Sequence, residues 1–150
     1  MNYPMILILH LIAATVWTGG HLVLALGFLP IALKRRNPEP VIQFESVYEK
    51  IALPALIVQV LTGLWLAHLV VPDVSDWFGL RSPLARLIAI KLVLLVLTLA
   101  LAADARLRLI PNLAAHHLTA LAWHIVPVTV ISVLFVVVGV MFRFGGFVGW

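Results

Sequence analysis

Long apolar runs, separated by short charged or proline-containing segments, dominate the chain. Each run has at least the roughly 20 residues that an α-helix needs to cross the hydrocarbon core of a bilayer. None shows the strict alternation of apolar and polar residues that is typical of a half-buried strand. The pattern predicts an all-α integral membrane four-helix bundle, with helices over about Pro4 to Leu33, Ile51 to Val71, Leu84 to Leu109 and Leu118 to Phe142.

The segments between the runs indicate where the chain leaves the membrane. Lys34 to Pro40 holds three cations and two prolines, which favour an exit. Val41 to Lys50 mixes charged and apolar residues, so we expect an interfacial helical segment that leads into the second span. Pro54 then falls in the first turn of that span, where proline is tolerated. Residues 1–150 are expected to form a single four-span transmembrane domain.

Composition agrees with a membrane protein. The chain is 63% hydrophobic and 11% charged, and its mean hydropathy is +1.14, which is too apolar for a soluble domain of 150 residues. The first run is too long for a signal peptide, so we expect a retained span. The absence of cysteine excludes disulfides, iron–sulfur clusters and thiolate metal sites. The net charge of +4 resides mainly in loops, so we expect a lipid bilayer as partner and no nucleic acid.

The loop cations predict the orientation of the bundle. The loops after the first and third spans share one side, and six cations lie there: Lys34, Arg35, Arg36, Lys50, Arg106 and Arg108. The other side has three: Arg81, Arg86 and Arg143. Because cytoplasmic loops carry an excess of Lys and Arg, both termini are predicted to lie outside. In a bacterial inner (plasma) membrane, where we place this multi-pass protein, that is the periplasmic side.

Histidines inside the apolar runs are the candidate functional residues, because an imidazole in a membrane is costly without a partner. His10 and His21 are eleven residues apart and face the same way on one helix. Depth along the alternating spans places His10, His68 and Lys91 in an outer tier. His21, His124 and, closer to the interface, His117 fall in an inner tier.

Neutral imidazoles on facing helices are the usual axial ligands of haem b in a helical bundle. The expected metal ligands are therefore His10 with His68 and His21 with His124, around one or two haems. Cations near the two interfaces, among them Arg81 outside and Arg106 inside, are candidates for binding haem propionates. Trp17 lies on the histidine stripe and completes the candidate cofactor-binding set.

Simpler structural interpretations of these residues compete with the haem hypothesis. A single membrane histidine is most often a hydrogen-bonded packing residue, and Lys91 could extend its stem toward the interface. Asp104 could simply pair with Arg108, one helical turn further along.

Several segments resemble the membrane domain of copper-resistance protein D (CopD). They are residues 79–92 and 102–111, together with Leu9-His10, Trp17-Thr18-Gly19-Gly20 and Val60-Leu-Thr-Gly-Leu64. That domain is similar to the HemJ-type protoporphyrinogen oxidase, a four-span membrane protein that binds haem b. The HemJ resemblance implies functional roles for His10 and Lys91, which match a first-span histidine and a third-span lysine needed in that relative. The chain departs from HemJ at Ile31, where that relative has arginine, and at Trp123-His124, where it has Asn-Glu.

Three functions follow from these observations. The leading hypothesis is a cytochrome b-like redox protein that passes electrons between a quinol or small soluble reductant and an acceptor. The second is copper transport or resistance, although Cu(I) prefers sulfur ligands and the chain offers only Met1, Met5 and Met141. The third is a membrane oxidoreductase of the HemJ type, with Lys91 as catalytic residue beside His10. The apolar surface would also allow a homodimer.

Overall fold

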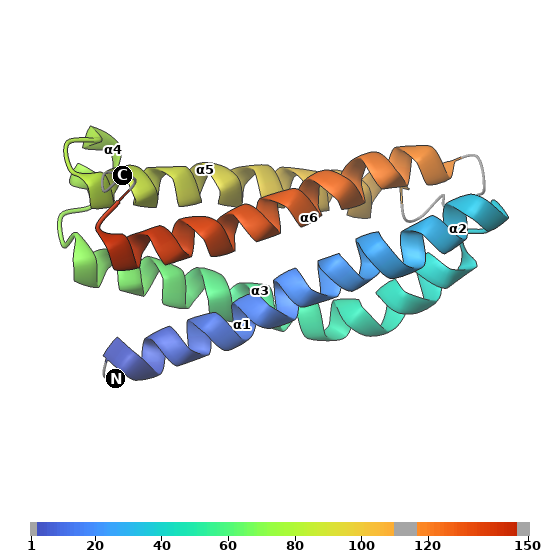
Figure 1. The fold of residues 1–150 in the computed structure, drawn as a ribbon, viewed down its shortest axis with the longest axis horizontal. Helices are drawn as coiled ribbons and strands as arrows, with labels where there is room; N and C mark the ends of the chain where they lie inside the picture. The colour runs from blue at the N-terminus through green and yellow to red at the C-terminus, as the bar shows by residue number, and fades with distance from the viewer. Residues whose placement is uncertain (1–2, 110–116, 147–150) are drawn as a thin grey trace.

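Four long helical segments run along the molecule in the computed structural model, which describes residues 3–109 and 117–146 (Figure 1). Each is long and apolar enough to cross a membrane, and no strand occurs within the described residues, so the predicted all-helical membrane architecture is confirmed. The segments are α1 (Tyr3–Val23), continued by the π-helical turn η1 (Leu24–Phe28) and by α2 (Leu29–Arg35); α3 (Glu39–Val70); α5 (Pro83–Asp104), continued by the π-helical turn η2 (Ala105–Leu109); and α6 (Leu118–Met141), followed by the 3₁₀ turn η5 (Phe142–Phe144). A short helix, α4 (Asp76–Gly79), lies between α3 and α5.

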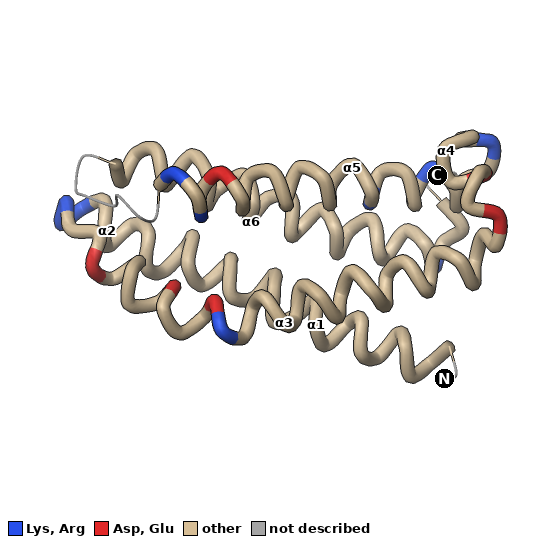
Figure 2. Tube along the Cα trace, turned by 180° about the vertical axis from the view of Figure 1, so that it is seen from behind, with Lys and Arg blue, Asp and Glu red and all other residues tan. Residues whose placement is uncertain are grey.

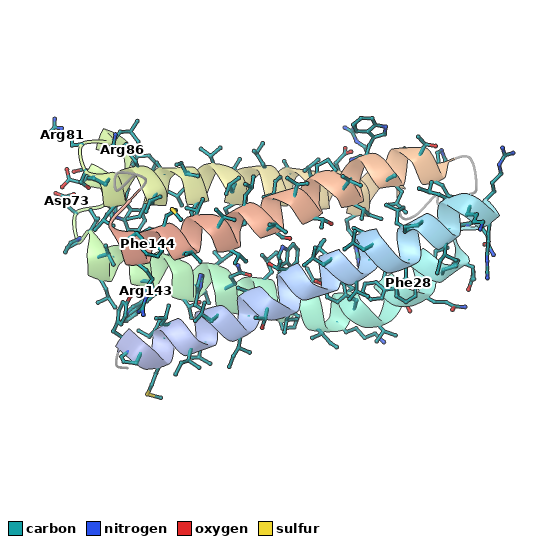
Figure 3. All side chains as sticks on the ribbon, in the orientation of Figure 1. Phe28, Asp73, Arg81, Arg86, Arg143 and Phe144 are labelled. Carbon is teal, nitrogen blue, oxygen red and sulfur yellow. The ribbon has the colours of Figure 1, made fainter. Side chains whose placement is uncertain are left out.

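The helices pack in two pairs. The helix α1 lies along α3, α5 lies along α6, and the contact between α1 and α6 joins the pairs. The two chain ends lie at the same end of the bundle (Figure 1). Charged residues gather toward the two ends (Figure 2), and Arg81, Arg86 and Arg143 lie at the end that holds the termini (Figure 3). The side of the membrane on which the termini lie stays a prediction.

The helix α3 begins earlier than the hydropathy pattern predicts. Residues 41–50 belong to the same helix as the second span, and Pro54 therefore lies in the helix interior, not in its first turn. Pro40 fits the first turn, and the Glu39 backbone N–H donates to Asn37 Oδ1 (3.0 Å), so nothing interrupts the helix. With 32 residues, α3 is about 48 Å long and exceeds the hydrocarbon core of roughly 30 Å. Its charged first turns can therefore extend beyond that core.

The interior of the bundle is apolar at both ends and in the middle. One cluster near α2 contains Leu24, Leu29, Ala32, Val41, Leu118, Leu121 and Ile125. A second, between α5 and α6, contains Leu87, Leu94, Ile131 and Val138, and a third joins Trp17, Ala52 and Val128. Large apolar side chains such as Ile57, Leu61 and Val96 are exposed on outward faces. Because these apolar side chains are exposed, the outward faces suit contact with lipid.

A tyrosine of α3 lies directly on the backbone of α1 at Gly20. The Tyr48 hydroxyl donates to the Trp17 carbonyl oxygen (2.8 Å), which holds the ring against that helix. A Cβ atom at Gly20 would stand 2.0 Å from Tyr48 Cε2, so only glycine leaves room for the ring. Close approach of two membrane helices over a small residue is a common packing solution.

We expect Gly20→Ala to lower the free energy of unfolding by about 1–3 kcal/mol, because the added methyl group displaces the Tyr48 ring. Gly19→Ala is the matched control, since a Cβ there meets no atom within 4 Å. Its effect should lie between zero and a stabilisation of about 1 kcal/mol, the helix preference of alanine over glycine. Thermal unfolding in detergent measures both. Equal effects of the two substitutions would contradict the packing described.

The orientation can be tested with single cysteines, because the native chain has none. Val74 lies in the exposed α3–α4 connection, and Asn37 lies in the exposed turn before α3. From the excess of cations on the Asn37 side, we expect a membrane-impermeant maleimide to label Val74→Cys in intact cells. Asn37→Cys should react only after the membrane is permeabilised. The opposite labelling pattern would show that the termini lie in the cytoplasm.

Candidate functional site

The His10 ring of α1 is held by hydrogen bonds to α3. Its Nδ1 atom lies 3.0 Å from the Gln59 carbonyl oxygen and 3.0 Å from Thr62 Oγ1. The Thr62 hydroxyl donates its own hydrogen to the Val58 carbonyl (2.6 Å), so toward His10 it can only accept. Both partners of Nδ1 are thus acceptors, and Nδ1 must carry the proton. The other ring nitrogen, Nε2, is left with a free lone pair.

This tautomer is the one expected of a metal-binding histidine. A ligating imidazole usually donates its second N–H to a carbonyl or carboxylate, which fixes the ring orientation and raises the basicity of the ligating nitrogen. Here the Gln59 carbonyl supplies that acceptor. Gly63 lets the ring lie close to α3, because a Cβ there would stand only 3.1 Å from His10 Cε1. His10 is therefore positioned before any ligand binds.

Lys91 of α5 lies in the interior beside the same site. Its Nζ atom is 5.1 Å from the centre of the Phe142 ring in η5. The same atom would be 3.5 Å from a Cβ atom added at Gly139 of α6. Its charge is close enough to act electrostatically on the His10 ring. Within residues 3–109 and 117–146, the ion pairs involve other cations, so no described carboxylate neutralises this ammonium.

The site also contains an unsatisfied acceptor. The Gln59 side-chain oxygen Oε1 is buried and receives no hydrogen bond from a described residue. A buried polar atom without a partner costs free energy, and such atoms are uncommon in native proteins. Among the described residues, the end of the bundle that holds the termini thus combines an imidazole nitrogen, an ammonium and an amide oxygen that have no hydrogen-bond or ion-pair partner of their own.

His21 occupies a separate site, further along α1. Its Nδ1 atom is 2.8 Å from the Trp17 carbonyl oxygen and 3.2 Å from the Tyr48 hydroxyl oxygen. The Trp17 and His21 ring centres are 4.4 Å apart, and the Tyr48 ring meets His21 edge-on at 5.6 Å. Tyr48 was not predicted from the sequence. The Gly19-Gly20 pair was the available signal, because it marks where another helix can approach.

His124 of α6 pairs with an acid and not with His21. Its Nδ1 atom is 2.9 Å from the Ala120 carbonyl oxygen, and its Nε2 atom is 2.8 Å from Asp104 Oδ2. Both ring nitrogens are therefore occupied. Asp104 also pairs with Arg108 (3.1 Å), as the i,i+4 spacing predicts. The structure does not bring His21 and His124 together.

The remaining candidates lie away from His10. His68 is exposed in the last turn of α3 and points roughly 140° from Gly63 around the helix axis, so it does not face the His10 ring. His117 lies at the start of α6, and Arg106 forms an ion pair with Glu49 of α3. Arg81 is exposed in the connection between α4 and α5 (Figure 3). None of them joins the site around His10.

No group of three or more His, Cys, Asp or Glu side chains in the described ranges is arranged to hold a metal ion. Depth along the spans nevertheless placed His10 and Lys91 at one level, and in the structure the Lys91 charge is close enough to act on the His10 ring. The pairing of His10 with His68 depended on the rotation of each helix about its axis, which depth alone does not fix. The roles of these residues as ligands stay predictions.

Comparisons with known proteins identify the family of the chain but no individual relative. Neither the curated proteins nor the solved structures give a significant match. A family model matches residues 42–142, which extend from the start of α3 into η5 and include Lys91, Asp104 and His124. His10 and His21 lie before the matched segment. The match covers well over half of the chain, so this four-helix membrane protein belongs to the copper resistance protein D (CopD) family.

Proposed function

We propose that this CopD-family membrane protein binds one haem b in the outer part of the bundle and uses it for electron transfer. The observation that carries the proposal is that His10 Nδ1 faces two acceptors, the Gln59 carbonyl oxygen and Thr62 Oγ1, which places the proton on Nδ1 and the lone pair on Nε2. Haem b requires no cysteine and takes imidazole as an axial ligand. When bound, it would supply reversible one-electron chemistry.

The charges around His10 support a haem over a free metal cation. An unpaired ammonium inside a membrane bundle is stabilised by a negatively charged partner. The propionates of haem are such partners, and Lys91 would hold one of them. A bare cation bound at His10 would instead be repelled by the Lys91 ammonium.

The protein's own residues would keep this site ordered. Gln59 and Thr62 hold the His10 ring in one tautomer and one orientation, and Gly63 leaves space for it. The apolar cluster of Leu87, Leu94, Ile131 and Val138 keeps water from the neighbouring interior. The haem would receive electrons from a quinol in the bacterial inner membrane or from a small soluble reductant beside it.

Copper handling is the second candidate, and the family match favours it. His10 would then be one copper ligand. The methionine that lies nearest to His10 in sequence, Met5, is 56% exposed on the outside of α1, so it faces lipid and not the interior. Met141 packs with the apolar residues between α5 and α6. Copper therefore has few soft ligands at this site.

Replacing His10 should remove the pigment. We expect His10→Ala to lower the haem content of the purified protein at least tenfold, because the axial nitrogen is lost. His68→Ala is the matched control and should retain haem, since His68 is exposed and points away. Absorption spectra and iron content per chain measure both. Equal loss of haem in the two variants would support His10 and His68 as a pair of haem ligands. Unchanged pigment in His10→Ala would exclude His10 as the ligand.

Replacing Lys91 separates haem from copper, because the two ligands predict opposite signs. Lys91→Met removes a propionate partner and should weaken haem binding by about tenfold, as expected for one charge-assisted hydrogen bond. Lys91→Arg should bind nearly as well as the native protein. For copper, the same loss of positive charge should strengthen binding. Titration of the ligand-free protein with haem and with Cu(I) or Cu(II) decides between them.

A further inference from the structure

His124 makes two hydrogen bonds that fix its protonation state. The Nδ1 atom faces the carbonyl oxygen of Ala120, which can only accept, so Nδ1 must carry a hydrogen. The Nε2 atom faces a carboxylate oxygen of Asp104 at 2.8 Å. Without a hydrogen between them, two lone pairs would oppose each other at that distance. The pair therefore holds one proton more than a neutral imidazole and a free carboxylate.

The surrounding charges locate this proton on the imidazole. The other oxygen of Asp104, Oδ1, forms an ion pair with Arg108 Nε at 3.1 Å, and this positive charge favours the ionised carboxylate. The His124 side chain is only 19% exposed, whereas that of Arg108 is 80% exposed. The arrangement is an imidazolium shielded from solvent, a carboxylate at the boundary and a guanidinium outside it.

This end of the bundle also holds the exposed cations Lys34, Arg35, Arg36 and Lys50, and His117 lies at the start of α6. Arg106 of η2 forms an ion pair with Glu49 of α3, and Glu45 lies close enough to both for their charges to act on it. On the side of η1 and α2, the apolar side chains Leu24, Leu29 and Ala32 pack on α6. Among the described residues, Asp104 is the carboxylate that contacts His124, and Arg108 forms an ion pair with that carboxylate.

We propose that His124 and Asp104 form a proton-binding site at the α2 end of the bundle, which holds one proton as an imidazolium–carboxylate pair. The proton comes from the aqueous phase next to Arg108 and binds Nε2, while Asp104 stays ionised, so the pair is neutral overall. This proton site goes beyond the proposed function and does not depend on the haem.

The bound proton can be observed directly. We expect solid-state nuclear magnetic resonance of the full chain, labelled with ¹⁵N-histidine and reconstituted in lipid bilayers at pH 7, to show both ring nitrogens of His124 protonated. The spectrum of His124→Gln assigns the signal. A neutral His124 ring with a bare Nε2 atom in the native protein would overturn the proposal, and that result needs no folded variant.

The partner can be tested with matched acid substitutions. Asp104→Asn removes the carboxylate and should move the His124 signal from the doubly protonated ring toward the neutral ring, because the charged acceptor of Nε2–H is lost. Asp76→Asn changes an exposed acid of α4 at the opposite end and should leave the signal unchanged. An unchanged signal in Asp104→Asn would overturn the role of this acid. A colourless protein that still shows the imidazolium would contradict the haem proposal and leave the proton site standing.

Discussion

The structure depends on polar side chains that cross from one helix to the next, where no water is available to satisfy them. Between α1 and α3 this happens twice, in reciprocal form. His10 of α1 bonds to α3 and lies against Gly63, while Tyr48 of α3 bonds to α1 and lies against Gly20. Bonds of this kind contribute roughly 0.6–2 kcal/mol each in membrane proteins, so their larger effect is on register. Each ring fixes where one helix lies along the other.

Most of the fold could be predicted from the sequence, because span length and hydropathy depend on local composition alone. The start of α3 could not be predicted, because Pro38 and Pro40 in the sequence indicate a break between helices. In the structure Pro38 precedes the first helical turn and Pro40 lies within it, where neither costs a hydrogen bond. The charged residues before Lys50 favoured a separate interfacial segment. A single helix that extends beyond the hydrocarbon core explains the same charge pattern.

The site was only partly predictable, for a geometric reason. Each residue advances a helix by 1.5 Å but rotates it by about 100°, so depth is robust and direction is not. Depth alone predicted that His10 and Lys91 lie at one level and that His21 and His124 lie at another. In the structure, the His21 ring contacts Tyr48 and the His124 ring contacts Asp104. The polar groups of the bundle thus divide into His10 with its α3 partners, toward the end that holds the termini, and the His124–Asp104 pair toward the α2 end.

The central claim is that a positioned imidazole beside an uncompensated ammonium binds an iron porphyrin. The most direct measurement is the pigment and metal inventory of the native protein, purified in mild detergent from haem-replete and copper-replete cells. The account predicts close to one haem b and one iron per chain, with a spectrum that changes on reduction. A colourless preparation containing copper, or containing neither metal, would contradict it.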